Sequence, residues 1–119
     1  MTAIRMRGPW RELAPGPVAA VGAQLGVYEL ADRHGTVTLI GYAGGRSRFG
    51  LRGEVAAHLE REDATGFRVE ATSAYLSRYR ELLMVHFADH GALPAGNGED
   101  PARIGRLSPA SPGPGPPWT

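Results

Sequence analysis

A single glutamate, Glu81, has neighbours in the sequence that suggest a chemical role. It lies in a long helical pattern, and at 100° per residue it points almost opposite to the broad apolar face. Its own face carries small and apolar residues: Ala74, Ser77, Met84, Val85 and Ala88. A carboxylate in such surroundings is partly buried and needs a partner, such as a metal ion or an arginine. Alternatively, Glu81 is exposed or pairs locally with Arg78.

A glycine-rich segment carries three arginines, Arg46, Arg48 and Arg52. Arg52 would stand in the first turn of a helix, where backbone N–H groups and a guanidinium can together bind a phosphate. The segment has neither the Gly-Lys-Ser/Thr of a P-loop nor the spacing of a dinucleotide-binding loop. It is therefore either a site for nucleic-acid phosphates or an ordinary solvated loop.

The histidines and tyrosines are less specific candidates. His58 falls on the apolar stripe of its predicted helix, where a histidine is more often a packed residue than a catalyst. His86 and His90 share one helix face at a spacing that suits a metal, but the sequence offers no evident third ligand. Tyr28 lies in a predicted strand, where β propensity alone favours tyrosine. Asn97 follows the last helix and is either a turn residue or part of the tail.

The hydrophobic pattern predicts the elements that would position these residues. Strands are predicted at 25–31, 36–43 and 67–71, and helices at 51–61 and from about 73 to 90. In the first strand, Tyr28 and Leu30 would face one side of the sheet, and Val27 and Glu29 the other. Gly91 suits the C′ position that ends the last helix.

Proline and glycine divide the chain into three parts. Residues 1–24 hold three prolines that forbid a long helix, so we expect an irregular N-terminal arm. Residues 25–97 would form the folded domain. Residues 98–119 are rich in Pro, Gly, Ser and Ala, which is typical of a disordered tail. The expected fold class is α+β, with a small three-stranded antiparallel sheet flanked by helices.

Composition limits the possible partners. The net charge is +1, all thirteen basic residues are arginine, and there is no cysteine. Residues 26–90 contain eight arginines and nine acids, which counts against strong non-specific DNA binding. No apolar run approaches the length of a membrane helix, so we expect a cytoplasmic protein without a membrane partner.

Two short runs, Gly26-Val27-Tyr28 and Leu39-Ile40-Gly41, precede the arginines, His58, Glu81 and Asn97. In this order and at roughly these spacings, the set resembles the GIY-YIG nuclease domain over about residues 26–97. One position departs, since Leu39 stands where the family usually has its second tyrosine. The resemblance makes Tyr28 the tyrosine of the first motif. The other residues that it matches to conserved positions of the family are Gly26, Gly41, Arg52 (or Arg48), His58, Glu81 and Asn97.

The resemblance implies a metal-dependent endonuclease. Glu81 would hold one Mg²⁺ or Mn²⁺ ion, Arg52 would neutralise the scissile phosphate, and Tyr28 would help to deprotonate water through His58. The expected substrate is DNA, with specificity supplied by a protein partner. The alternative, which Leu39 suggests, is a catalytically silent module of the same fold that binds nucleic acid or a protein.

Overall fold

A β-hairpin forms the centre of the fold. The computed structural model describes residues 5–97, and within them β2 (Gly26–Ala31) pairs antiparallel with β3 (Val37–Ala43). In the turn between them, the Asp32 carboxylate accepts hydrogen bonds from the backbone amides of His34 and Thr36. Gly35 adopts a φ of 84°, which favours glycine. The predicted hairpin is confirmed.

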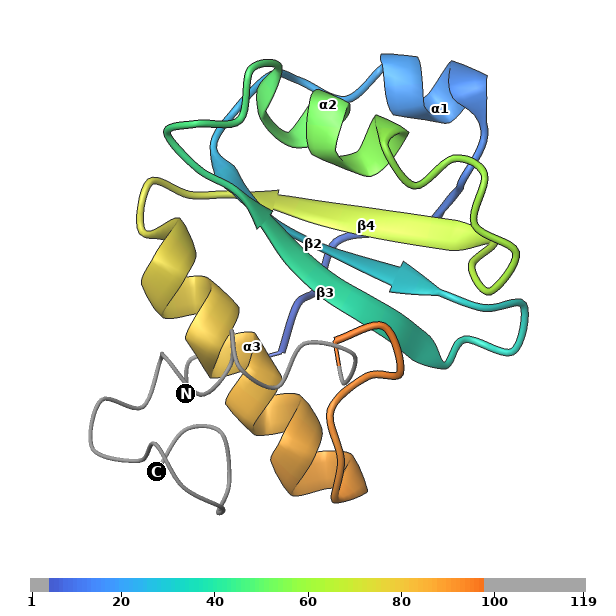
Figure 1. Ribbon diagram of the computed structural model, residues 1–119, viewed down its shortest axis with the longest axis vertical. Coiled ribbons are helices and arrows are strands. Elements are labelled where there is room, and N and C mark those ends of the chain that lie inside the picture. Colours follow the sequence, from blue (N-terminus) through green and yellow to red (C-terminus); the bar gives the residue numbers. More distant parts are fainter. Residues whose placement is uncertain (1–4, 98–119) are drawn as a thin grey trace.

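Two further strands complete a four-stranded antiparallel sheet (Figure 1). β4 (Gly66–Ala71) pairs with β2, and the two-residue β1 (Arg11–Glu12) pairs with β4. The strand order is β1-β4-β2-β3. β2 is therefore internal, whereas β3 lies at an edge where side chains from both faces of the sheet can meet.

Helices cover both faces of this sheet (Figure 1). α1 (Pro15–Ala19) and α2 (Gly50–Ala56) pack on one face, and α3 (Tyr75–His90) packs on the other. Side chains of β2 alternate between the two faces of the sheet, as predicted. Tyr28 and Leu30 join the core under α1 and α2, while Val27 joins the core under α3. The core under α3 consists of Met6, Val27, Ile40, Tyr79, Leu82 and Leu83.

The N-terminal arm differs from its prediction. It is not wholly irregular, because β1 extends the sheet to four strands and α1 forms a short helix that begins at a proline. Met6 and Val18 are buried in the two cores, so the arm is part of the packed structure. A two-residue strand is too short to show a hydrophobic period, which is why the sequence did not indicate it.

Other boundaries shift by a few residues. α2 ends at Ala56 instead of residue 61, and turns follow it to residue 60. α3 begins at Tyr75 and ends at His90, and the φ of 74° at Gly91, which follows it, confirms the predicted C′ position. The predicted disordered tail, residues 98–119, lies outside the described residues. Within residues 5–97, no helix has the length and apolar character to cross a membrane.

Candidate functional site

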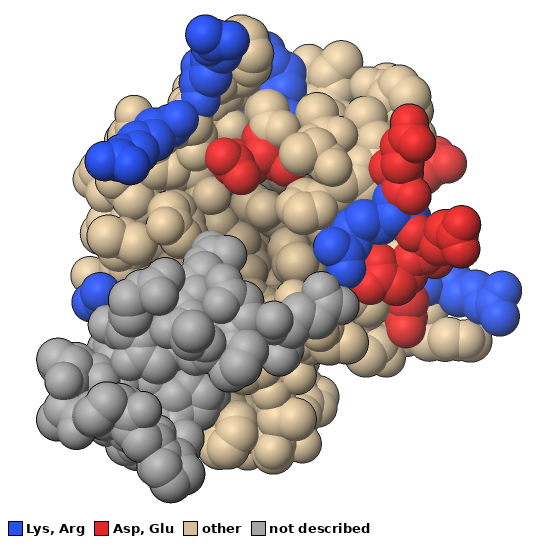
Figure 2. All heavy atoms as spheres, in the orientation of Figure 1, with Lys and Arg blue, Asp and Glu red and all other residues tan. Residues whose placement is uncertain are grey.

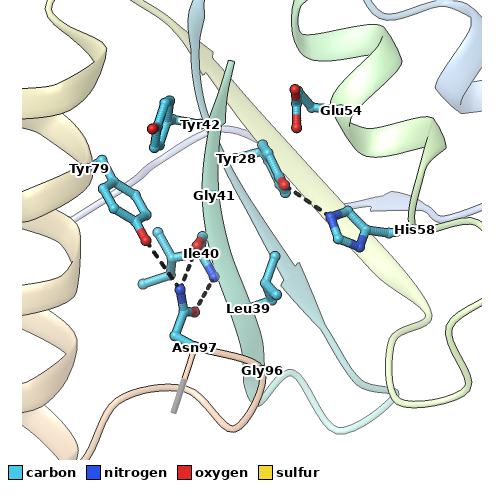
Figure 3. A pocket seen from close by; sticks show the side chains of 10 residues that line it. All are labelled: Tyr28, Leu39, Ile40, Gly41, Tyr42, Glu54, His58, Tyr79, Gly96 and Asn97. Carbon is cyan, nitrogen blue, oxygen red and sulfur yellow. Dashed lines mark hydrogen bonds between the residues drawn. The ribbon is translucent and has the colours of Figure 1, made fainter. Parts of the chain in front are cut away.

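A pocket of about 240 Å³ lies along β3 at the edge of the sheet. We call it the edge pocket. Side chains from both faces of the sheet reach it around the edge strand, as Figure 3 shows. Its lining residues are Tyr28, Leu39, Ile40, Gly41, Tyr42, Glu54, His58, Tyr79, Gly96 and Asn97.

A hydrogen bond between Tyr28 and His58 is the main polar feature of the edge pocket (Figure 3). The Tyr28 hydroxyl lies 3.0 Å from Nε2 of His58, which follows α2. Partial burial lowers the pKa of His58, and the nearby Arg61 guanidinium lowers it further. The ring is therefore neutral at pH 7. In the tautomer that carries its proton on Nδ1, Nε2 accepts a hydrogen bond from the Tyr28 hydroxyl, and the pair is then equipped for proton transfer.

Glycine at position 41 makes room for the Tyr28 phenol. Tyr28 and Gly41 are directly paired across β2 and β3. A Cβ at position 41 would overlap Cζ and the hydroxyl oxygen of Tyr28. Gly26 similarly allows close packing, because a Cβ there would overlap the carbonyl of Glu70 on β4. Both glycines of the two sequence motifs thus have a steric role, and Gly41 acts directly on the site.

Glu54 is a site residue that the sequence analysis missed. It lies on α2, one helical turn before His58, and lines the edge pocket beside Tyr28 (Figure 3). The Ser47 hydroxyl donates a hydrogen bond of 2.7 Å to Oε2 of Glu54, and the amide of Gly44 donates to Ser47. These bonds fix the carboxylate. The i, i+4 spacing of Glu54 and His58 was the signal that could have revealed it.

Asn97 closes the other end of the edge pocket. Its side-chain oxygen accepts a hydrogen bond of 2.7 Å from the amide of Ile40, and its nitrogen donates one of 2.8 Å to the Ile40 carbonyl. The amide group thus satisfies the outward backbone groups of edge strand β3 as a neighbouring strand would. Asn97 is 7% exposed. It is a buried structural residue that brings the segment after α3 to the pocket.

Leu39 occupies the position where the resemblance expects a second tyrosine. Its side chain lies on the same side of β3 as Tyr28 and His58 (Figure 3) and packs partly buried against the core under α2. A leucine provides no hydroxyl there, so the polar chemistry of this side of the pocket comes from Tyr28, His58 and Glu54.

A second cavity, of about 560 Å³, adjoins the edge pocket at the β3–α2 loop. We call it the loop cavity. Tyr42 and Glu54 line both cavities. The other lining residues of the loop cavity are Gly44, Gly45, Arg46, Ser47, Tyr75 and Leu76. Of the three predicted phosphate-binding arginines, Arg46 lines this cavity.

Arg52 and Arg48 lie elsewhere. The Arg52 guanidinium is directed toward the turn after α1, where it donates a hydrogen bond of 3.5 Å to the carbonyl of Val21. Arg48 is exposed on the β3–α2 loop. Neither residue lines the edge pocket or the loop cavity. Neither arginine therefore forms part of the lining around the Tyr28 hydroxyl.

Glu81 also lies away from the edge pocket. Its side chain is 46% exposed and forms an ion pair with Arg78, three residues earlier on α3. Arg78 simultaneously binds both carboxylate oxygens of Glu70 on β4. This is the second of the two sequence alternatives for Glu81, the exposed glutamate with a local arginine partner. The structure brings together Tyr28, His58, Gly41 and Asn97, but not Glu81.

The fit of the site to a divalent cation can be judged from its carboxylates. Glu81 does not fit, because Arg78 neutralises it outside the pocket. Glu54 fits better, since Mg²⁺ commonly uses one or two carboxylates together with waters and substrate phosphates. Within residues 5–97, no group of three or more His, Cys, Asp or Glu side chains is arranged to hold a metal ion. Any cation at Glu54 would thus depend on the substrate for further ligands.

Residues 4–89 match a family described as a domain of unknown function, DUF7508. This match spans most of the chain, and the protein belongs to that family. No curated protein and no solved structure gives a significant match to the chain. The description of this family supplies no activity.

Proposed function

We propose that the edge pocket is the active site of an endonuclease that hydrolyses phosphodiester bonds in nucleic acid. The observation that carries the proposal is the hydrogen bond of 3.0 Å between the Tyr28 hydroxyl and Nε2 of His58. The resemblance to GIY-YIG nucleases supplies the reaction class. A cytoplasmic location and a DNA substrate are parts of the same proposal.

The pair provides a route for the proton of the attacking water. Tyr28 donates its proton to Nε2 of His58 and takes a proton from water. The water oxygen attacks phosphorus while the P–O bond to the leaving oxygen breaks; the leaving oxygen takes a proton from solvent, and His58 later releases its own proton to solvent. Partial burial and the nearby Arg61 guanidinium lower the pKa of His58, so the ring can accept a proton at neutral pH. Proton transfer by positioned side chains contributes about 10²- to 10⁴-fold to a rate.

Charge on the phosphate requires a cation. Arg46 lines the adjoining loop cavity, which Arg48 and Arg52 do not. A divalent ion, when bound, would supply further neutralisation of the phosphate. Glu54 is the carboxylate placed to hold such an ion, because it lines the edge pocket and is oriented by Ser47.

The test compares two carboxylates with labelled DNA substrates in Mg²⁺ or Mn²⁺. We expect Glu54→Gln to lower metal-dependent cleavage at least tenfold and Glu81→Gln to change it less than threefold. Binding of Mn²⁺, measured by its electron paramagnetic resonance signal in the presence of an uncleaved oligonucleotide, should weaken only in the Glu54 variant. Equal cleavage by both variants and wild type would contradict the assignment of Glu54.

A catalytically silent binding module is the second candidate. Two observations favour it: Leu39 provides no hydroxyl, and Arg78 neutralises Glu81. The two candidates separate in one experiment. A silent module binds oligonucleotide or protein without cutting any single-stranded, duplex or branched DNA, whereas the proposed nuclease cuts one of them and loses this activity in His58→Ala.

A further inference from the structure

We infer that the loop cavity binds an unpaired nucleotide of a single-stranded nucleic acid, with the base against Tyr42, Tyr75 and Leu76 and the phosphate at Arg46. The inference deepens the proposed function, on which it rests for the class of substrate. It assigns to this chain a preference for single strands over duplexes.

Two tyrosines give the loop cavity an aromatic wall. The rings of Tyr42 and Tyr75 are stacked, with centroids 5.7 Å apart and an interplanar angle of 18°. The Tyr75 hydroxyl accepts a hydrogen bond of 3.2 Å from the amide of Gly45, which fixes its ring. Gly44 lets the loop approach this ring, since a Cβ there would lie 2.7 Å from Cε1 of Tyr75. The platform is therefore held in place before any ligand binds.

The remaining walls suit a nucleotide. Leu76 is 40% exposed and adds an apolar surface at the start of α3, while Arg46 adds a cation. The volume of about 560 Å³ lies within the roughly 300–1,000 Å³ of small-ligand sites. Figure 2 shows basic side chains at the upper left, where the β3–α2 loop lies, and acidic and basic side chains together at the right. This charge distribution favours a phosphate near the loop.

The loop cavity adjoins the proposed active site. Tyr42 and Glu54 line both cavities, so a strand with one base on the aromatic wall carries its neighbouring phosphate toward Tyr28. A base must be unstacked and unpaired to lie flat against a tyrosine ring. A continuous duplex keeps its bases paired, and this requirement selects a single strand or a frayed end.

The test measures binding by fluorescence anisotropy, without divalent metal so that no cleavage occurs. The probes are a labelled 12-nucleotide DNA, the RNA of the same sequence and the corresponding DNA duplex. Tyr75→Ala should weaken single-strand binding roughly 5- to 150-fold, the loss expected for one stacked base. Tyr75→Phe keeps the ring and should stay within threefold of wild type. Arg46→Gln should lower the slope of log K against log salt concentration by about one, as expected for the loss of one phosphate contact. Arg33→Gln in the distant hairpin should leave this slope unchanged.

The outcomes distinguish this inference from the proposed function. Binding of duplex as tight as that of both single strands, or Tyr75→Ala binding like wild type, would overturn the inference. Duplex cleavage that depends on His58 but not on Tyr75 would overturn it while leaving the nuclease intact. Tight single-strand binding that requires Tyr75, in a protein that cuts nothing, would support the cavity and reject the nuclease.

Discussion

Polar side chains on the two faces of the sheet have different kinds of partners. Under α3, charged groups form ion pairs: Arg68 binds Glu29, and Arg78 binds both Glu70 and Glu81. We call these five residues the ion-pair network. Under α2, the polar groups of the edge pocket are joined by hydrogen bonds, Tyr28 to His58 and Ser47 to Glu54, beside a cavity.

This difference separates structural charges from candidate functional groups. Each acid of the ion-pair network contacts an arginine that holds β2, β4 and α3 together, so its charge is already compensated. The Tyr28–His58 pair can exchange a proton, and Glu54 accepts its bond from a neutral hydroxyl. A carboxylate held by a hydroxyl keeps its negative charge for a ligand, whereas one held by a guanidinium does not.

Loss of an arginine from the ion-pair network should change the stability of the fold most. Arg68→Leu should lower the free energy of unfolding at pH 7 by about 3–5 kcal/mol, because it leaves the buried Glu29 without its cation. Glu29 is 6% exposed, and Arg68 also lies over the Trp10 ring at 4.3 Å. Urea unfolding measures the change. The control is Arg80→Leu, at an exposed position of α3.

The pH dependence of that variant sharpens the test. Burial raises the pKa of Glu29 despite its contact with Arg68. The folded protein therefore holds this proton at a higher pH than the unfolded chain, and stability falls as the pH rises from about 4.5 through the folded pKa. The free energy of unfolding lost in Arg68→Leu, relative to Arg80→Leu, should be smaller at pH 5 than at pH 7.5. A loss independent of pH would show that Glu29 is not its cause.

Asn97→Ala should have the next largest effect. The substitution removes the two hydrogen bonds that satisfy the amide and carbonyl of Ile40. Leaving a buried backbone group unpaired costs about 1–3 kcal/mol, so unfolding should occur at a clearly lower urea concentration. Hydrogen exchange at the Ile40 amide should accelerate more than at Val27 in the sheet centre. Unchanged exchange at Ile40 would contradict the capping role of Asn97.

Gly41→Ala should disturb the edge pocket itself. The added Cβ would overlap the Tyr28 phenol, and overpacking of this kind costs about 1–3 kcal/mol. The Tyr28–His58 hydrogen bond should also be displaced, so cleavage should fall with stability. Gly16→Ala in α1 is the control, because no atom lies within 4 Å of its added Cβ. A Gly41 variant as stable and active as this control would rule out the proposed steric role.

The smallest effect is a change with pH in the wild-type protein. Because burial and Arg61 lower the pKa of His58, the ring stays neutral until the pH falls below its ordinary value of about 6.5. The value of kcat/KM should therefore be flat near pH 7 and decline up to tenfold per unit on the acid side. The contribution of His58 to the free energy of unfolding has the same pH dependence. It is complete above about pH 6.5 and is lost as the pH falls through the lowered pKa of the folded protein.

Much of the fold could be predicted from local patterns. Alternation placed Tyr28 and Val27 on opposite faces of β2, and Gly91 marked the end of α3. The long-range partners could not be predicted in this way. Nothing in the period of α3 distinguishes a Glu81 directed to a metal from one held by Arg78, because both lie on the face away from the core. Glu54 was overlooked because its position beside Tyr28 depends on how α2 packs on the sheet.

The proposed function makes the Tyr28–His58 pair, and not Glu81, the centre of the chemistry. The most direct measurement is the rate of cleavage of a labelled DNA strand by Tyr28→Phe and Glu81→Gln, after circular dichroism has shown both variants to be folded. We predict a loss of at least 100-fold for Tyr28→Phe and less than threefold for Glu81→Gln. A folded Tyr28→Phe variant that cuts at the wild-type rate, or a Glu81→Gln variant that has lost its activity, would contradict the account.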